Sequence, residues 1–354
     1  MPVPIQRTEE LTVRALESFL RDRGAQDVVI ENLTIPANGF SSEIILLDGT
    51  WTIDGTVHDR PSVLRVSPQG HRLFPTDSFD SEVSTQRILA GASVPLPRLL
   101  FSESDTRYFG APFTIMEHLD GSVPRDLPSY HRQGWLRDLP EAGQRQVWFD
   151  AIASLADLHV AAVPPPVASG GGINVGSVPA QISYLREHGH FFGIDFAVHR
   201  IYDGALAWLE ENVPDLPAPD TLVWGDARLG NIVFRDERVV GLLDWEMAGY
   251  GYAESDVAWF LHMDRHLSEG IGAERLAGLA TAEESVEKYE ARTGKPLRHL
   301  PYFQVLAAVA FGVVTKRVVH LLGLSGIVPP GGEFPLHRNA TRLLETVLDE
   351  AGAL

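Results

Sequence analysis

Cysteine is absent from the 354 residues and lysine is nearly so. Without cysteine, disulfides, thiolate metal sites and cysteine nucleophiles are excluded. The lysines are Lys288, Lys295 and Lys316, so a cation needed earlier in the chain must be an arginine or a histidine. Three common enzyme motifs are also missing: Walker-type G-x-x-x-x-G-K-[ST], the G-x-S-x-G nucleophile elbow and the dinucleotide-binding G-x-G-x-x-G.

Positive charge is scarce as well. The chain has 29 Lys and Arg against 47 Asp and Glu, a formal net charge of -18. This charge repels nucleic acid and anionic membranes, and no run of Lys or Arg offsets it, so we expect neither as a partner. Neutral or cationic small molecules are easier partners, although the acidic residues are equally explained by solubility alone.

Membrane and export signals are also missing from the pattern. We find no apolar run that predicts a membrane span and no signal segment at the start, so the expectation is a soluble, cytoplasmic protein. At this length a single core is too large to be typical, and two domains or two lobes are expected.

The first third of the chain is rich in predicted strands. Residues 9–23 repeat apolar positions at helical spacing and predict an amphipathic helix, and residues 80–90 predict a second helix. Short β-branched or aromatic runs bounded by Gly, Pro, Asn or Asp predict strands at 28–35, 41–49, 61–67, 98–104 and 112–119.

From Gly121 onward the pattern is mainly helical. The piece from Val163 to Pro179 is a Pro- and Gly-rich loop, longer than a plain connection needs. Helices are predicted at 142–160, 180–188, 196–212, 255–266, 273–293, 302–322 and 336–351.

Residues 222–246, LVWGDARLGNIVFRDERVVGLLDWE, are the strand-like exception in this helical half. IVF and VVGLLDW flank RDER and predict a β-hairpin, with Asp226 and Asn231 before its first strand and Asp244 at the end of its second. Antiparallel pairing brings the start of one strand beside the end of the other, so the three side chains should converge. An Asn oxygen beside a carboxylate suits Mg²⁺, and Asp226 could then orient or deprotonate a hydroxyl. Each element alone also occurs in ordinary turns, whereas the full set is much rarer.

This block resembles the catalytic signature of the aminoglycoside phosphotransferase family, a branch of the protein-kinase-like fold, in which H-G-D-x-x-x-x-N is followed by a strand, a turn and D-W or D-F. The resemblance implies an α+β, two-lobed protein-kinase-like fold, with a small N-terminal antiparallel β lobe carrying one helix and a larger, mainly helical C-terminal lobe. It places the nucleotide-binding lobe at 1–115, the hinge at 116–120, and the catalytic loop and substrate site within 121–354.

The same resemblance implies an ATP- and Mg²⁺-dependent kinase that moves the γ-phosphate to a hydroxyl of a small molecule, expected to be neutral or cationic. Asp226 would be the catalytic base, and Asn231 and Asp244 the Mg²⁺ ligands. Arg228 stands where many kinases have a Lys that reaches the transferred phosphate, and a solvated Arg is an equal alternative.

In the small lobe the resemblance implies the nucleotide contacts. The loop NGFSSE would cradle phosphates with Gly39, Phe40, Ser41 and Ser42, although Asn-Gly is also a plain hairpin turn. Arg65 occupies the position of the usual strand Lys and would pair with Glu82, unless it projects from an edge strand into water. In FTIMEHLDG, Met116 would border the adenine, and the main chain of Glu117 and Leu119 would bind it.

Two departures from the family pattern are visible. Trp224 replaces the usual His before Gly-Asp, and Arg65 replaces the usual Lys. They favour an alternative in which the chain is a catalytically weak or inactive kinase-like nucleotide-binding or regulatory module, whereas the intact Asp226, Asn231 and Asp244 favour the enzyme. His159 is expected to be a packed structural residue. Asp256 is expected to brace the catalytic loop from the following helix, or else to be a simple helix N-terminal carboxylate.

Overall fold

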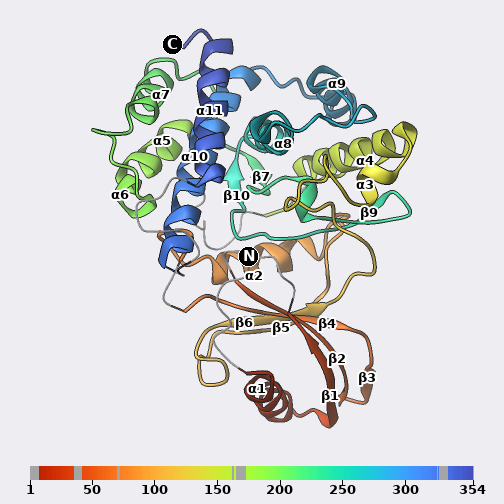
Figure 1. Ribbon diagram of the computed structural model, residues 1–354. Helices are drawn as coiled ribbons and strands as arrows, with labels where there is room; N and C mark the ends of the chain where they lie inside the picture. The colour runs from red at the N-terminus through yellow and green to blue at the C-terminus, as the bar shows by residue number, and fades with distance from the viewer. Residues whose placement is uncertain are drawn as a thin grey trace. The chain divides into compact units, whose positions relative to one another are not determined.

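The computed structural model describes residues 8–35, 42–69, 72–161, 163–164, 173–324, 326 and 334–353. The chain divides into two compact units (Figure 1). The first contains residues 1–74 and 97–119, and the second contains residues 75–96 and 120–354. Helix α2 (Phe79–Leu89), which the sequence pattern inserts between strands of the small lobe, is therefore grouped with the second unit.

The first unit is an antiparallel sheet with helix α1 (Glu9–Asp22) against one face (Figure 1). Five strands run in the order β1-β2-β4-β6-β5, and β3 pairs with β2. The strands are β1 (Gln26–Thr34), β2 (Glu43–Ile53), β3 (Thr56–His58), β4 (Ser62–Val66), β5 (Leu99–Glu103) and β6 (Phe113–Glu117). The five strands expected here are confirmed, and the short β3 was not predicted.

The α1 side of the sheet holds the core of this unit. Leu16, Phe19 and Leu20 of α1 pack with Leu64 and Phe113 of the sheet, and all five are buried. Thr8 caps the helix by accepting a hydrogen bond from the N–H of Leu11. The amphipathic pattern at 9–23 therefore predicted both the helix and the face that it buries.

The opposite face of the sheet carries the residues expected to meet a nucleotide. Side chains alternate along a strand, and the cross-strand pairs Ile44–Arg65 and Arg65–Thr114 place these side chains on one face. Val63 and Met116 form a pair on that same face. Arg65 and Met116 thus share the sheet face that α1 does not cover.

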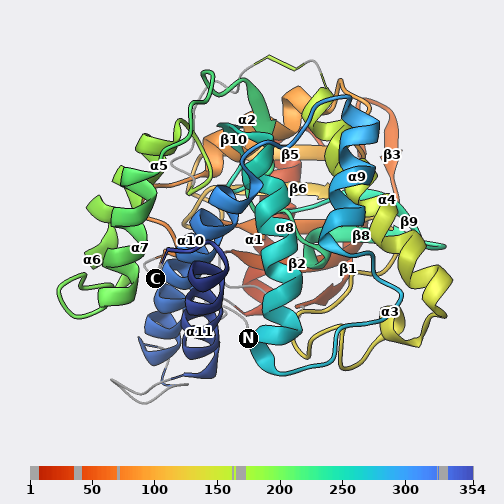
Figure 2. The ribbon, with the colours of Figure 1, turned by 90° about the horizontal axis from the view of Figure 1, so that it is seen from above.

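The second unit is mainly helical (Figure 2). Its long helix α10 (Leu300–Leu324) packs against α8 (Ala253–Leu267) and α11 (Pro335–Glu350). The other helices are α3 (Trp135–Asp138), α4 (Glu141–Val160), α5 (Val178–Glu187), α6 (Gly189–Phe192), α7 (Arg200–Glu211) and α9 (Ala282–Thr293), with short 3₁₀ turns η1 (Leu229–Asn231) and η2 (Glu269–Ile271).

Two expectations for the helical half need correction. The helix expected from residue 273 begins at Ala282, where Thr281 and Glu284 form a reciprocal capping box that starts α9. An apolar run long enough to cross a bilayer does exist, because α10 has the length and the apolar composition of a membrane-spanning helix. Two thirds of its most apolar 18-residue stretch is buried inside the protein, as is expected of a core helix.

Four short strands lie in the segment 221–251, which contains Asp226, Asn231 and Asp244. Strands β8 (Ile232–Arg235) and β9 (Arg238–Leu242) form the predicted hairpin, and β7 (Thr221–Val223) pairs with β10 (Gly249–Gly251). Helix α4 anchors the hairpin, because the carboxylate of Asp150 accepts hydrogen bonds from the Val239 N–H and from Arg238, both at 2.8 Å. The hairpin is thus fixed to the helical core.

Candidate active site

The hairpin brings the predicted polar residues to one end of the ribbon. Ile232 pairs with Leu242, and the N–H of Leu243 donates to the carbonyl oxygen of Asn231 at 2.8 Å. Asn231 therefore lies beside the residue that precedes Asp244. Asp244 has a left-handed backbone (φ 59°), a conformation that Asp tolerates better than most residues.

Asp226 is held by three side chains. Its Oδ2 accepts from Nδ2 of Asn231 and from Nε of Arg228, both at 2.8 Å, and its Oδ1 accepts from the indole N–H of Trp259 at 2.9 Å. A carboxylate has about four acceptor positions, two on each oxygen. Both acceptor positions on Oδ2 are occupied, so the acceptor position that remains is on Oδ1.

Asn231 also donates to the main-chain carbonyl oxygen of Asp226 at 3.0 Å. Both hydrogens of its amide nitrogen point at Asp226, so its amide oxygen faces the other way. That oxygen and the Asp244 carboxylate are hard donors of the kind that Mg²⁺ takes. Among the described residues, no group of three or more His, Asp or Glu side chains is placed to hold a metal ion. The pair fits Mg²⁺ because this ion usually completes its shell with water and phosphate oxygens.

Arg228 is an ion-paired residue. It contacts Asp226 through Nε and Asp126 through Nη1, and its side chain is 20% exposed. Burial alone would lower the pKa of Arg228, but the carboxylates of Asp126, Asp226 and Asp244 raise it overall, so the guanidinium stays charged. This geometry removes the solvated alternative for Arg228.

Asp256, at the start of α8, supports the loop from behind. It is fully buried and accepts hydrogen bonds from the main-chain N–H of Trp224 at 2.6 Å and of Gly225 at 2.8 Å. His159 shares a 3.0 Å hydrogen bond with it, and the other ring nitrogen of His159 contacts the Tyr289 hydroxyl. The expected bracing contact and the packed histidine are both present.

Gly225 cannot be replaced without moving the loop. Its φ is +88°, and a Cβ there would lie 2.2 Å from the carbonyl oxygen of Met247. Trp224, before it, is buried and donates its indole N–H to the carbonyl oxygen of Leu243 at 2.8 Å. The tryptophan that replaces the family's histidine therefore joins the loop to the strand end that carries Asp244.

Three contacts of the site were not predicted from the sequence. Asp126 touches Arg228, Trp259 touches Asp226, and Asn174 donates to the Gly225 carbonyl oxygen at 2.8 Å. Trp259 had a usable signal, because it follows Asp256 by three residues and so shares its helix face. Asp126 and Asn174 come from irregular segments that carry no such pattern.

The nucleotide residues are placed only in part. Gly39, Phe40 and Ser41 lie outside the described residues, and Ser42 directly precedes β2. Arg65 and Met116 share a sheet face, as described above, whereas Glu82 is on α2 in the other unit. The pairing of Arg65 with Glu82 stays a prediction.

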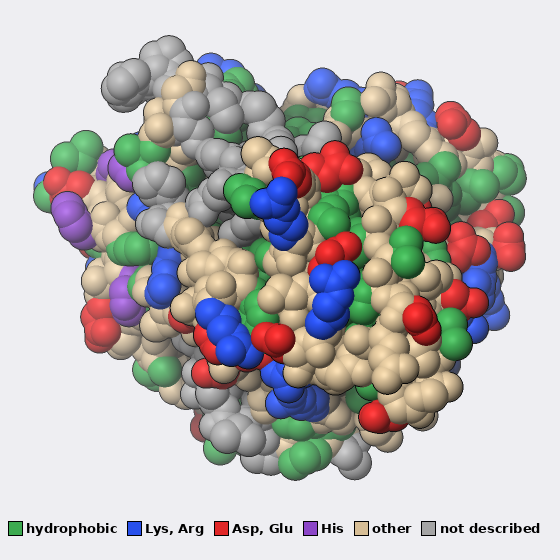
Figure 3. Space-filling model, turned by 90° about the horizontal axis from the view of Figure 1, so that it is seen from below, with side chains coloured by type: hydrophobic (Ala, Val, Ile, Leu, Met, Phe, Trp, Pro, Cys, Tyr) green, Lys and Arg blue, Asp and Glu red, His purple; other side chains and the backbone are tan. Residues whose placement is uncertain are grey.

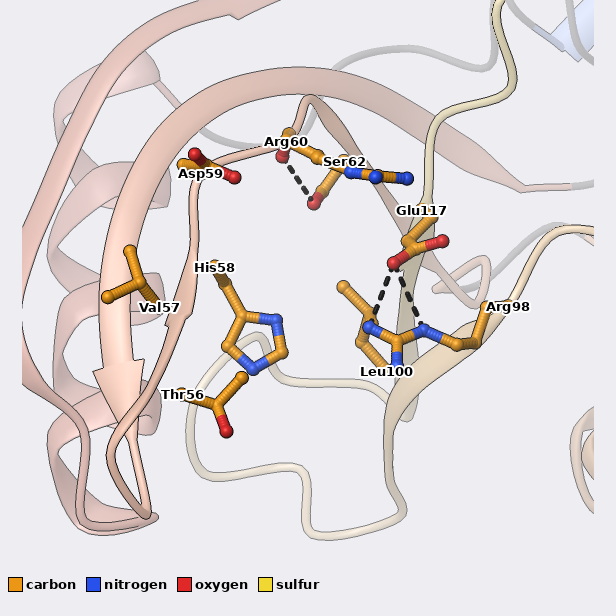
Figure 4. A pocket seen from close by; sticks show the side chains of 9 residues that line it. All are labelled: Thr56, Val57, His58, Asp59, Arg60, Ser62, Arg98, Leu100 and Glu117. Carbon is orange, nitrogen blue, oxygen red and sulfur yellow. Dashed lines mark hydrogen bonds and ion pairs between the residues drawn. The ribbon is translucent and has the colours of Figure 1, made fainter.

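A pocket of about 400 Å³ also lies in the first unit (Figure 4). On one side of it, the Glu117 carboxylate is paired with the Arg98 guanidinium at 2.8 Å. Of the predicted site residues, only Glu117 lines this pocket. The lining residues are Thr56, Val57, His58, Asp59, Arg60, Ser62, Arg98, Leu100 and Glu117. The pocket therefore does not coincide with the predicted chemistry.

One face of the molecule carries described side chains of both charges (Figure 3). Acidic and basic side chains are interspersed on the face seen in Figure 3, where the described residues show no broad basic patch.

The sheet with its helical remainder and the Asp-Asn-Asp hairpin define a protein-kinase-like fold. Residues 51–293 match the family model of the phosphotransferase enzyme family, which is more than half of the chain. The chain therefore belongs to the phosphotransferase enzyme family.

Curated relatives are larger proteins. The chain is 31% identical over 203 residues to acyl-CoA dehydrogenase family member 11 of Homo sapiens, covering 56% of this chain and 24% of the relative. The protein of the same name from Rattus norvegicus is 28% identical over 324 residues, covering 87% and 39%. The matched region thus spans less than half the length of these relatives.

Solved structures support the fold. A protein from Ralstonia eutropha, provisionally described as an aminoglycoside phosphotransferase, has a TM-score of 0.68 at 20% identity, covering 96% of this chain and 98% of that one. A thermostable mutant of aminoglycoside phosphotransferase APH(4)-Ia, in ternary complex with AMP-PNP and hygromycin B, has a TM-score of 0.58 at 16% identity, covering 95% and 98%. The expected kinase-like fold is confirmed.

Proposed function

We propose that this protein is a kinase that uses ATP and Mg²⁺ to phosphorylate a hydroxyl group of a small molecule. The observation that carries the proposal is the carboxylate of Asp226, held by Asn231, Arg228 and Trp259 with one acceptor position remaining on Oδ1. A hydroxyl that donates to this position would be oriented, and its proton could move to Oδ1 as the phosphate is transferred. Asp226 is thus the proposed base.

Asn231 and Asp244 are the residues proposed to hold Mg²⁺. When bound, the ion would supply positive charge that offsets the negative charge of the phosphate groups. The proposal is supported by the shared position of the two residues at one end of the hairpin and by the orientation of the Asn231 amide oxygen. Arg228, a charged neighbour of Asp226, is proposed to take part in catalysis by fixing the base.

The nucleotide is proposed to bind the sheet face that α1 leaves uncovered. Arg65 would pair with phosphates and with Glu82, Met116 would border the adenine, and the main chain of Glu117 and Leu119 would bind its edge. The Glu117 N–H already donates to the carbonyl oxygen of Arg98 at 2.9 Å, so we propose that the carbonyl group of Glu117 binds the adenine. The segment from Gly39 to Ser42 is the proposed phosphate loop, and similar structures contain AMP-PNP or ADP.

In this proposal residues 1–115 form the nucleotide lobe, 116–120 the hinge, and 121–354 the catalytic and substrate lobe. The cytoplasm is the proposed location.

For the acceptor, two chemical classes have support. The net charge of -18 favours a neutral or cationic hydroxyl compound. The names of the curated relatives favour a second class, a hydroxyl on an acyl thioester of coenzyme A, which is an anion.

The proposal is tested in two stages. Thermal shift with ATP is measured with and without Mg²⁺, and transfer from γ-labelled ATP is then measured on a panel of amino sugars, amino alcohols, sugars and hydroxyacyl-CoA thioesters. Stabilisation by Mg²⁺–ATP together with labelled product supports the kinase, and the labelled class identifies the acceptor. Nucleotide binding without transfer to any panel member, and without hydrolysis, would instead favour the nucleotide-binding module.

A further inference from the structure

A single guanidinium joins two carboxylates at the catalytic loop. Arg228 Nε donates to Asp226 Oδ2 at 2.8 Å, and Nη1 pairs with Oδ2 of Asp126. The three side chains are between 15% and 25% exposed. Ion pairs with so little solvent around them are screened less than ordinary surface pairs.

The loop backbone is shaped to fit this ion pair. A Cβ on Gly230 would lie 2.7 Å from both carboxylate oxygens of Asp126 and 2.6 Å from Nη1 of Arg228. The glycine is required here for space, because the main chain passes directly against the two charged groups. A side chain at this position would have to displace Asp126 or Arg228.

The segment that carries Asp126 is fastened to the same hairpin. The N–H of Ser122 donates to the Phe234 carbonyl oxygen at 2.7 Å, and the N–H of Phe234 donates back to Ser122 at 2.9 Å. Asp126 follows four residues later. Its position relative to the catalytic loop is therefore set by main-chain hydrogen bonds as well as by its own charge.

Electrostatics favour keeping the pair intact. Burial raises the pKa of Asp126, and the positive charge of Arg228 opposes that rise. Removing Arg228 would leave the partly buried Asp126 carboxylate without its compensating charge, and removing Asp126 would leave Arg228 with one of its two ion pairs.

Building on the proposed role of Asp226 as the base, we propose that Asp126 is a positioning residue for phosphate transfer. Asp126 holds the Arg228 guanidinium at the angle at which Nε binds Oδ2 of Asp226. This contact turns Oδ1 toward the acceptor hydroxyl. Without Asp126, Arg228 swings away and the base loses one of its three fixed contacts, which slows the chemical step and leaves nucleotide binding unchanged.

The test uses the full chain with Mg²⁺–ATP as the probe and release of inorganic phosphate as the readout, together with labelled acceptor where the panel yields one. The variants are Asp126→Asn, Asp126→Glu, Arg228→Gln and the double variant Asp126→Asn/Arg228→Gln. The matched control is Asp157→Asn, which breaks a 2.6 Å Asp–Arg pair with Arg292 between α4 and α9.

We expect Asp126→Asn to lower kcat roughly 10-fold to 100-fold with KM for ATP within about twofold, which is the cost of a misplaced catalytic group. Asp126→Glu should recover part of the loss. The double variant should be no slower than Arg228→Gln alone, because both substitutions break one chain of contacts. The Asp157→Asn control should keep the wild-type kcat. An Asp126→Asn variant with wild-type kcat, or a double variant whose losses multiply, would overturn the proposal.

A crystal structure of Asp126→Asn separates this proposal from the proposed function. In this variant we expect the distance between Nε of Arg228 and Oδ2 of Asp226 to exceed hydrogen-bonding distance. An unchanged Arg228–Asp226 contact overturns the positioning role even if the wild type is an active kinase. A released Arg228 supports the positioning role by a measurement that does not depend on activity, whereas a wild type without turnover counts against the proposed function.

Discussion

The indole N–H of Trp224, at the start of the catalytic loop, donates to the carbonyl oxygen of Leu243, just after the second strand of the hairpin, at 2.8 Å. Trp224 is also packed against Trp245, with ring centroids 5.7 Å apart. Leu243 precedes Asp244, so this contact links the residue that replaces the family's histidine to a proposed metal ligand. The tryptophan at this position therefore makes a polar contact between the loop and the strand end.

Trp224→Phe should lower both the stability of the protein and its response to Mg²⁺. It keeps the aromatic bulk but leaves the partly buried Leu243 carbonyl oxygen without this donor, which costs about 1 kcal/mol of unfolding free energy. It should also weaken the Mg²⁺ dependence of nucleotide binding, because Asp244 loses a support. Urea unfolding and Mg²⁺ titration measure the two effects.

The matched control is Trp148→Phe. Trp148 is equally buried and donates its indole N–H to the Ser285 hydroxyl at 2.8 Å, between α4 and α9. It should lose similar stability and keep the wild-type Mg²⁺ response. Equal Mg²⁺ responses in the two variants would show that Trp224 acts on folding alone.

Asp226→Asn should abolish most of the chemistry and leave nucleotide affinity unchanged. The variant is nearly isosteric but is a poor proton acceptor, so kcat should fall by about 10²-fold or more. Calorimetry with Mg²⁺–ATP and a transfer assay check the two parts. Asp236→Asn, an exposed position in the turn at the other end of the hairpin, is the control. Undiminished transfer by Asp226→Asn would remove the base role.

Asn231→Ala and Asp244→Ala should each weaken the dependence of ATP binding on a divalent ion, because each removes one proposed protein ligand. Asn231→Ala also removes two hydrogen bonds to Asp226, so it should lower kcat in addition. Thermal shift with ATP across a Mg²⁺ series measures the dependence. Wild-type metal affinity in both variants would show that the metal assignment is wrong.

Arg65→Ala should weaken ATP binding, whereas Arg65→Lys should retain much of it. Lys supplies the charge that kinases usually use at this position, but as a point charge without the bidentate geometry of a guanidinium. Binding is measured by calorimetry with ATP and with adenosine. We expect adenosine affinity to be unchanged in both variants, because the proposed contact is to phosphates. An equal loss of adenosine and ATP binding would argue against it.

Unfolding free energy should fall as the pH drops from about 7 toward 4. Burial lowers the pKa of His262 to about 3 and that of His266 to about 4, whereas an unfolded histidine titrates near 6.5. Between these values the unfolded chain binds protons that the folded chain does not, so stability is lost with acidification. Urea unfolding across this pH range measures the slope.

His262→Leu should flatten that slope. The Nε2 of His262 is buried without a hydrogen-bond partner among the described residues, so the substitution should cost little stability at pH 7. Met263→Leu, on the same buried helix, changes packing without changing a titratable group and should keep the wild-type slope. A slope that is unchanged in His262→Leu contradicts the assignment.

Local patterns determined much of this protein. The amphipathic repeat of α1, five of the six strands of the small sheet and the β8–β9 hairpin all follow from side-chain periodicity and turn residues within short windows of sequence. The approach of Asn231 to the strand end that precedes Asp244 also followed, because pairing within a hairpin is a local consequence of its turn.

Tertiary structure alone decided what surrounds these residues. Asp126 and Arg228 are 102 positions apart, and Asn174 and Gly225 are 51 apart. No local rule relates such positions, since their contacts arise when separate segments pack around one loop. Trp224 shows the same limit: the sequence identifies the replaced residue, but only packing shows that its N–H reaches Leu243. Local energetics set helices, strands and turns, whereas the partners of a buried polar group depend on which distant segments can satisfy it.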